Sequence, residues 1–181
     1  MKLFRNIARK FFCVAMLVIV FLAGYNIILR RVYPTQYYDY VEKYSAEYDV
    51  SKYLVLAVIK CESDFDENAQ SSAGAKGLMQ LTEETFFDVS KMVGDQDKYT
   101  YSQHWNNAEI NIKYGTKYLS YLYDMFGDKN AVIAAYNAGL GNVKNWIGND
   151  NVLQYSEIKF LETADYVDKV LKAEEYYTKL Y

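Results

Sequence analysis

Hydrophobic positions in this chain form one unbroken run near the N-terminus, followed by a series of helically spaced clusters. Residues 11–29 contain no charged side chain over nineteen positions. A helix of that length crosses about 30 Å of hydrocarbon, so the run predicts a transmembrane anchor. A cleaved signal peptide is the alternative, but its apolar region is about 7–15 residues long and LAGYN is a weak match to a cleavage site.

From residue 37 onward, apolar and aromatic side chains recur near a period of 3.6, which is typical of amphipathic helices. The predicted helices cover residues 37–48, 52–61, 107–126, 131–138 and 162–180, and a further helix begins after Thr82. The segment 52–61 is apolar on most sides, so we expect it to be the central buried helix. No paired-strand pattern and no fixed repeat is present. The predicted fold class is therefore all-α.

Polar residues and glycines mark the expected ends of these helices. Ser51 and Thr82 are predicted N-caps, and Thr163 or a neighbour is expected to cap the last helix. Gly127 is expected to stop the helix at 107–126. Two glycines, Gly139 and Gly141, are expected to stop the helix at 131–138. Residues 66–76 read as a loop, and residues 90–105 as loop and short turns.

Basic residues gather at the N-terminal end and predict the topology of the chain. Residues 1–31 hold six Lys or Arg and no acidic residue, four of them before the apolar run and two, Arg30 and Arg31, directly after it. The positive-inside rule then favours a cytoplasmic N-terminus. We expect a basic tail at 1–10, a membrane anchor at 11–29, a spacer at 30–36 and one external domain at 37–181. The predicted location is the outer face of the cytoplasmic membrane.

The external part is acidic, which narrows its partners. Residues 32–181 carry fourteen Lys and twenty-three Asp or Glu, a net charge of -9. Binding to a phosphate backbone needs clustered cations, so nucleic acid is excluded as a partner. Cys13 and Cys61 form no disulfide framework. The sequence has no metal-ligand cluster and no phosphate-binding loop, so we expect no metal and no cofactor.

Glu62 is the strongest candidate for chemistry. It follows the apolar segment 52–61, so burial should disfavour its anion and raise its pKa. The free carbonyls at the end of that helix act in the same direction. Nearby Asp64 and Asp66 would add repulsion if they are ionised. A carboxyl with a raised pKa can act as a general acid near neutral pH.

Four segments in order extend this interpretation. They are ESDF followed by AQSSAGAKGLMQL, NNAEINIKYGTKYL at 106–119, AAYNAGLGNV at 134–143, and ETADYVDKV at 162–170. Together they resemble the soluble lytic transglycosylase family over about residues 37–175. The chain departs from the family pattern at four usual proline positions, which hold Glu67, Glu83, Leu140 and Lys159. Proline there stiffens the backbone without performing chemistry.

The resemblance implies a fold similar to goose-type lysozyme and an activity on the glycan strands of peptidoglycan. Glu62 would be the single catalytic acid/base in cleavage of the β-1,4 bond between N-acetylmuramic acid and N-acetylglucosamine, leaving 1,6-anhydromuramyl ends. The resemblance also implies a set of substrate-binding residues: Ser63, Met79, Gln80, Tyr136, Asn137 and Tyr166. Met79 would pack against an apolar sugar face, and Gln80 would bond an N-acetyl or hydroxyl group. Gly74 and Gly77 would let the loop approach the glycan closely.

Three alternatives remain open from the sequence. A muramidase on the same fold would hydrolyse the bond with water. A catalytically idle wall-binding subunit could serve cell-envelope machinery such as a secretion, conjugation or sporulation apparatus. A cysteine hydrolase would use Cys61 with His104, the single histidine.

Overall fold

The computed structural model describes residues 2–147 and 152–181, with side-chain surroundings from residue 12 onward. The chain divides into two compact units. One contains the residues up to Pro34 together with Leu180 and Tyr181, and the other contains Thr35–Lys179. The predicted basic tail at 1–10 has its side chains outside the described part.

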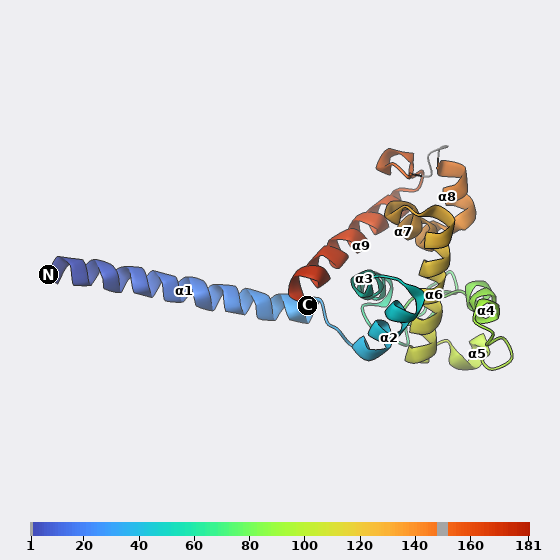
Figure 1. The fold of residues 1–181 in the computed structure, drawn as a ribbon, viewed down its shortest axis with the longest axis horizontal. Coiled ribbons are helices and arrows are strands. Elements are labelled where there is room, and N and C mark those ends of the chain that lie inside the picture. Colours follow the sequence, from blue (N-terminus) through green and yellow to red (C-terminus); the bar gives the residue numbers. More distant parts are fainter. Residues whose placement is uncertain (1, 148–151) are drawn as a thin grey trace. The chain divides into compact units, whose positions relative to one another are not determined.

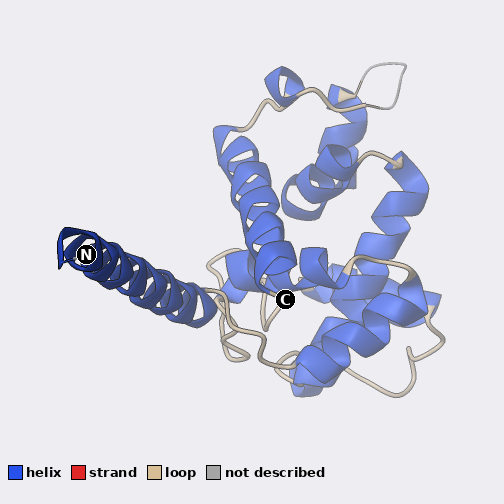
Figure 2. Cartoon of the chain, turned by 60° about the vertical axis from the view of Figure 1, so that its left-hand side comes forward, coloured by secondary structure: helices blue, strands red, loops and turns tan. Residues whose placement is uncertain are grey.

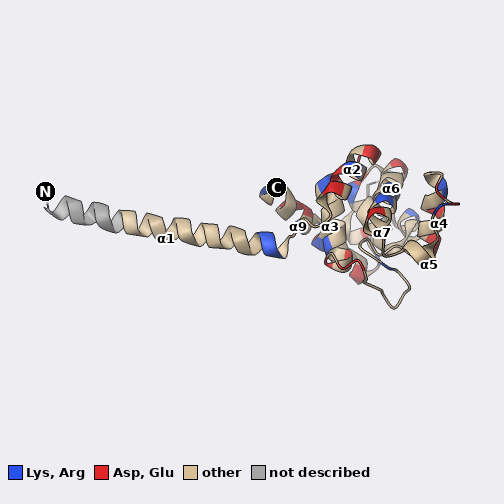
Figure 3. Cartoon of the chain, turned by 90° about the horizontal axis from the view of Figure 1, so that it is seen from below, with Lys and Arg blue, Asp and Glu red and all other residues tan. Residues whose placement is uncertain are grey.

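The first unit is built on one long helix, α1 (Lys2–Val32), shown in Figure 1. Its segment Phe12–Val32 is long and apolar enough to cross a membrane, and none of it is buried against protein. Figure 3 shows that the part of α1 drawn in colour carries no charged residue before its end, where Arg30 and Arg31 lie. Helix α1 ends at Val32, so it continues past position 29 into the predicted spacer.

In the described residues of the second unit, helices joined by loops make up the regular structure and no strand is present, as Figure 2 shows, which confirms the predicted fold class. Only isolated bridges join Gln70 to Lys76 and Lys76 to Leu81. Its elements are α2 (Tyr38–Tyr48), α3 (Lys52–Ser63), α4 (Glu83–Met92), α5 (Tyr101–His104), α6 (Ala108–Phe126), α7 (Lys129–Ala138), α8 (Leu140–Trp146), the 3₁₀ turn η1 (Tyr155–Glu157) and α9 (Leu161–Leu180).

Helix α3 is the buried helix that its sequence predicts. Residues 54–59 are each fully buried, and Ser51 Oγ accepts a hydrogen bond from Leu54 N at 3.4 Å as the expected N-cap. Unlike the prediction, α3 continues through Glu62 to Ser63. The backbone then reverses over Asp64 and Phe65, which both adopt positive φ angles of 52° and 66°. Two successive non-glycine residues with left-handed backbone angles are uncommon and cost free energy. The surrounding structure must therefore hold the backbone in this conformation at the end of α3.

A small aromatic core holds α4 against α6. Phe86 is 2% exposed and Tyr114 is fully buried, and their rings meet edge to face with centroids 4.7 Å apart. Thr82 caps α4 as predicted, accepting from Thr85 N at 3.2 Å. Edge-to-face pairs add about 0.5–1.5 kcal/mol to the free energy of area burial. This packing fixes α4 as one wall of a cavity described below.

Several predicted helix ends were wrong. Helix α4 extends to Met92 through residues that were expected to be loop. Helix α7, capped by Asp128, begins at Lys129, two residues before its predicted start. Gly139 ends α7 with a φ of 86°, but Gly141 lies inside α8, which the sequence did not predict. Thr163 lies within α9 and its hydroxyl bonds another element, so it is no cap.

Candidate active site

Glu62 lies in the last turn of α3 and accepts a hydrogen bond from α9. Tyr166 Oη donates to Glu62 Oε1 at 2.5 Å. Burial raises the pKa of the Glu62 carboxyl to about 7, and the bond from Tyr166 acts in the opposite direction. The Glu62 charge in turn contributes to raised pKa values at Tyr136 and Tyr166, so both phenols lie near the carboxyl. The site therefore holds a carboxyl whose pKa lies well above its ordinary value, so it can be protonated near neutral pH.

The neighbouring carboxylates contribute nothing to the raised pKa of Glu62, contrary to one part of the prediction. Asp64 is exposed and forms an ion pair with Lys60. Asp66 is also exposed and accepts from Asn68 N at 2.9 Å. Because the backbone reverses after Ser63, both side chains lie in solvent, where repulsion is screened. Desolvation alone raises this pKa, as the apolar run before Glu62 predicts.

Ser63 ties the end of α3 to the loop that follows Lys76. Its Oγ donates to Leu78 O at 2.8 Å and also lies 3.2 Å from Ile59 O. A hydroxyl carries one proton, so only its acceptor capacity remains for a ligand. Ser63 therefore has a structural role, because its hydroxyl connects the end of α3 to the loop that contains Leu78.

The loop 76–81 is closed by its own backbone and by Asn111 of α6. Lys76 and Leu81 exchange two N–H···O bonds of 3.0 Å. Asn111 is fully buried; its Oδ1 accepts from Met79 N at 2.8 Å, and its Nδ2 donates to Lys76 O and Trp105 O at 3.2 and 2.9 Å. One buried amide therefore fixes three backbone positions around the loop.

Met79 does not have the predicted role of contacting a sugar through its side chain. It is fully buried, and a Cβ added at Gly115 of α6 would lie 2.3 Å from its Sδ. Its backbone, in contrast, is held on both sides, because Tyr136 Oη donates to Met79 O at 2.8 Å while Asn111 accepts from Met79 N. Met79 therefore anchors the loop in the core.

Gly77 is required by packing against protein, which differs from the prediction that it clears space for a glycan. Its φ is 80°, and a Cβ there would lie 2.3 Å from Asn111 Nδ2 and 2.5 Å from Trp105 O. Gly74 has a φ of 85° and no atom within 4 Å of a built Cβ. Only Gly74 keeps open space beside it, so the two glycines have different reasons for their positive φ.

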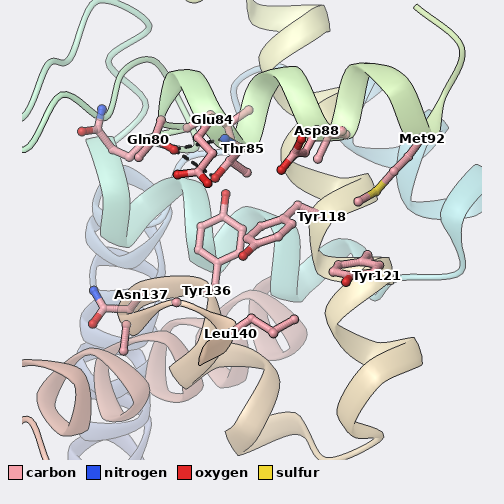
Figure 4. Close-up of a pocket in the computed structure, with 15 residues that line it drawn as sticks. Gln80, Glu84, Thr85, Asp88, Met92, Tyr118, Tyr121, Tyr136, Asn137 and Leu140 are labelled. Carbon is pink, nitrogen blue, oxygen red and sulfur yellow. Dashed lines mark hydrogen bonds between the residues drawn. The ribbon is translucent and has the colours of Figure 1, made fainter. Parts of the chain in front are cut away.

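A cavity of about 600 Å³ lies between α4 and the segment joining α7 to α8. Figure 4 shows Glu84 and Asp88 of α4 on one side, Tyr118 and Tyr136 beneath them, and Asn137 and Leu140 on the opposite side. The rings of Tyr118 and Tyr136 lie 5.6 Å apart, and Tyr118 stacks on Tyr121 at 6.3 Å. An aromatic floor with polar walls suits the mixed apolar and hydroxylated faces of a sugar.

Three of the predicted substrate-binding residues line this cavity. Gln80, Tyr136 and Asn137 approach it from the loop before α4 and from the end of α7. Gln80 adopts a φ of 48°, and its Nε2 donates to Ala69 O and Gly77 O at 3.1 and 2.9 Å. Glu62 and Tyr166 lie outside the cavity lining, and Tyr136 connects the two regions because it lines the cavity and interacts with the Glu62 charge.

Cys61 is unsuited to act as a nucleophile. Burial is the main cause that raises the pKa of its thiol to about 11, and the Glu62 charge adds to it. The thiolate is the reactive form, so a raised pKa makes the thiol inert near neutrality. His104 belongs to α5, where its Nδ1 lies 3.1 Å from Thr100 N. Within the described part of the chain, no group of three or more His, Cys, Asp or Glu is arranged to hold a metal ion.

Sequence reasoning missed Asn111 and the cavity-facing part of α6. Tyr118 and Tyr121 are not among the predicted substrate-binding residues, but both line the cavity. The signal for Asn111 was an uncharged polar residue on the helix face that also carries Tyr114 and Gly115, three and four positions later. A polar residue at a buried position must find hydrogen-bond partners, which in this case are backbone groups of a neighbouring loop.

The comparisons with known proteins agree with this arrangement. The family described as the transglycosylase SLT domain matches residues 39–159. The soluble lytic murein transglycosylase of Salmonella typhimurium is 36% identical over 155 residues, covering 82% of this chain and 24% of that protein. The membrane-bound lytic murein transglycosylase C of Serratia proteamaculans is 34% identical, covering 72% of this chain and 38% of that protein.

A solved structure matches the fold as well. It is an inactive mutant of the lytic transglycosylase Slt from Pseudomonas aeruginosa, in which one glutamate is replaced by glutamine. It superimposes with a TM-score of 0.74 at 29% identity, covering 82% of this chain and 25% of that one. The chain thus spans about a quarter of the length of the soluble relatives that it matches.

Proposed function

The chain belongs to the transglycosylase SLT family, and from this premise we propose that it is a peptidoglycan lytic transglycosylase. It cleaves the β-1,4 bond between N-acetylmuramic acid and N-acetylglucosamine and leaves 1,6-anhydromuramyl ends. The observation that carries the proposal is the half-buried Glu62 carboxyl, whose pKa lies at about 7 and whose Oε1 accepts a hydrogen bond from Tyr166.

A single carboxyl is sufficient for this reaction. A retaining glycosidase places a second carboxyl about 5–5.5 Å away, and an inverting enzyme places it about 6.5–9.5 Å away. Asp64 and Asp66, the nearest acidic residues in sequence, are exposed. In a transglycosylase the muramyl 6-hydroxyl attacks its own anomeric carbon, so no second protein carboxylate has to activate water.

Glu62 performs both proton transfers in this scheme. The protonated carboxyl donates its proton to the bridging oxygen as the glycosidic bond breaks, and N-acetylglucosamine leaves with a hydroxyl. The resulting carboxylate accepts the proton of the 6-hydroxyl as that oxygen bonds to the anomeric carbon, which restores the starting state. A pKa of about 7 suits a group that must donate and then accept a proton near neutral pH.

The substrate lies in the cavity beside Tyr136 in this proposal. Gln80 and Asn137 supply hydrogen bonds from its walls, and Tyr118 and Tyr136 supply apolar surface. Ser63 and Met79 keep the loop in place beneath the sugar chain through Leu78 O and the core contact with Gly115. The membrane-bound relative and the exposed apolar helix α1 support membrane anchoring.

The orientation of the anchor is part of the proposal. The N-terminus lies in the cytoplasm and the unit Thr35–Lys179 lies outside, because basic residues precede the span. Protease treatment of spheroplasts should digest the external unit without lysis, while a cytoplasmic marker protein stays intact. Protection of the external unit would contradict this orientation.

The activity is tested by the products of digestion. Purified full-length protein in detergent is incubated with sacculi, and the soluble fragments are analysed by mass spectrometry. Anhydromuramyl ends are expected, whereas reducing ends would identify a hydrolase on the same fold. Glu62→Gln should lower the rate by at least about 10²-fold because the proton donor is lost. The matched control is Cys61→Ala at the neighbouring position, which should stay within about twofold of the wild type because its thiol is inert.

A further inference from the structure

Thr163 of α9 donates a hydrogen bond to the Asn137 side chain at the end of α7. Thr163 is 2% exposed, and its Oγ1 donates to Asn137 Oδ1 at 2.8 Å across 26 positions of sequence. Asn137 itself is exposed and lines the cavity of about 600 Å³. Because the hydroxyl proton points at Oδ1, the amide is held with its carbonyl toward α9. The Nδ2 group, with two N–H donors, then remains for a ligand.

Gln80 presents the opposite chemistry to the same cavity. Its Nε2 donates to Ala69 O at 3.1 Å and to Gly77 O at 2.9 Å, which occupies both of its hydrogens. The remaining polar atom is Oε1, an acceptor. Figure 4 shows Gln80 and Asn137 approaching the cavity from its two sides. One side thus supplies an acceptor and the other a donor.

An acceptor and a donor together match a secondary amide. We propose that Thr163 is a positioning residue that fixes Asn137 as a hydrogen-bond donor, so that Asn137 and Gln80 together recognise the acetamido group of a substrate sugar. The acetamido N–H donates to Gln80 Oε1, and its carbonyl accepts from Asn137 Nδ2. This inference rests on the proposed function, because it assumes an N-acetylated glycan in the cavity.

A change at Thr163 should affect substrate recognition without affecting proton transfer by Glu62. Tyr166, which bonds Glu62, follows Thr163 by three residues on the same face of α9. Removing the Thr163 hydroxyl leaves the Tyr166 phenol and its bond to Glu62 unchanged. The Michaelis constant should therefore change while kcat and its pH profile do not.

The experiment uses full-length protein in detergent and soluble glycan strands, either N-acetylated or chemically de-N-acetylated. Thr163→Val keeps the shape of the side chain and removes the donor, and Thr163→Ser restores it. For N-acetylated strands, Thr163→Val should raise KM about five- to tenfold, the value of one hydrogen bond, with kcat within about twofold. Thr163→Ser should stay within about twofold of the wild type in both constants.

Asn137→Asp tests the polarity directly and acts at an exposed position where folding is not at risk. A carboxylate can still accept from Thr163 but offers no donor to the carbonyl of the ligand. Binding is measured as Kd in a Glu62→Gln background, so that no strand is cleaved. Asn137→Asp should weaken binding of N-acetylated strands by at least as much as Thr163→Val. For de-N-acetylated strands, Thr163→Val should leave the affinity unchanged, and Asn137→Asp should not weaken binding, because the protonated amine of the sugar attracts a carboxylate.

Four results would overturn the inference: an unchanged KM in Thr163→Val, a loss in Thr163→Ser equal to that in Thr163→Val, wild-type affinity in Asn137→Asp, or equal losses for acetylated and deacetylated strands. Failure of the proposed function would look different. In that case the unmodified protein would release no anhydromuramyl fragments from sacculi, whatever the residue at position 163.

Discussion

The Tyr166 phenol donates a 2.5 Å hydrogen bond to the Glu62 carboxyl across 104 positions of sequence. Tyr166 is 8% exposed, and burial together with the Glu62 charge raises its own pKa, so it stays a protonated donor. Two effects therefore compete at Glu62, where burial favours the neutral acid and the bond favours the anion. Burial prevails, because the pKa ends at about 7.

Tyr166→Phe should raise the pKa of Glu62 further. The substitution removes the bond that stabilises the anion and leaves the burial in place. The activity that requires the protonated carboxyl should then persist to higher pH than in the wild type. The measurement is kcat/KM against pH for both proteins, and an unchanged or lowered upper limb would contradict the assigned role of Tyr166.

Glu62→Gln should stabilise the fold at alkaline pH. The folded pKa of about 7 lies above the ordinary value of 4.5, so the folded state binds more protons between these values and stability falls as pH rises through them. Glutamine stays neutral and avoids this loss. The free energy of unfolding of Glu62→Gln relative to wild type should increase from pH 5 to pH 8, by up to about 3 kcal/mol at 1.36 kcal/mol per pKa unit.

Chemical denaturation at pH 5 and pH 8 measures this difference. Cys61→Ala is the control, since the pKa of that thiol is about 11 and the group is uncharged at both pH values. Its effect on stability should be the same at pH 5 and pH 8. A constant difference between Glu62→Gln and wild type at the two pH values would show that the carboxyl is not desolvated.

Gly115→Ala should destabilise the protein by about 1–3 kcal/mol through overpacking. The new Cβ would lie 2.3 Å from Met79 Sδ and 2.9 Å from Met79 Cβ, and Met79 is fully buried. The control is Gly141→Ala in α8, where no atom lies within 4 Å and alanine improves helix propensity. Gly141→Ala should be neutral or stabilising by up to about 1 kcal/mol. Equal stability of the two variants in denaturant titrations would refute the contact.

Asn111→Ala should reduce both stability and activity. It removes the side-chain partner of Met79 N and Trp105 O, whereas Lys76 O keeps its bond from Leu81 N, and one buried unsatisfied group costs about 1–3 kcal/mol. The loop that carries Gln80 should loosen, which we expect to appear as faster amide hydrogen exchange at residues 76–81 than in the wild type. Wild-type exchange rates there would mean that the backbone bridge between Lys76 and Leu81 is sufficient alone.

The family membership, the all-α fold and the pKa shift at Glu62 could be predicted from sequence for a physical reason. Helical periodicity and capping depend only on residues close together in the sequence. The apolar segment 52–61 likewise predicts that the carboxyl directly after it is desolvated. The N-caps Ser51 and Thr82 follow from the same short-range rules and are confirmed.

Contacts between distant segments could not be predicted in this way. Met79 and Gly77 were assigned to the glycan, but their neighbours prove to be Gly115 and Asn111 of α6, more than thirty residues away. The roles of Thr163 and Asn111 likewise depend on partners in other elements. Spacing along the chain contains no information about which helix face contacts which loop. Helix α8 was missed because Gly139 and Gly141 were both interpreted as residues that end a helix.

Helix α6 contributes to the site from several successive turns. Asn111 and Gly115 fit the loop 76–81, and Tyr118 and Tyr121 line the cavity. Each residue of a helix is rotated by about 100° from the previous one, so inserting or deleting a single residue between Gly115 and Tyr118 would turn both tyrosines away while the loop contacts stayed in register. The length of this helix is therefore as tightly constrained as the identity of its side chains.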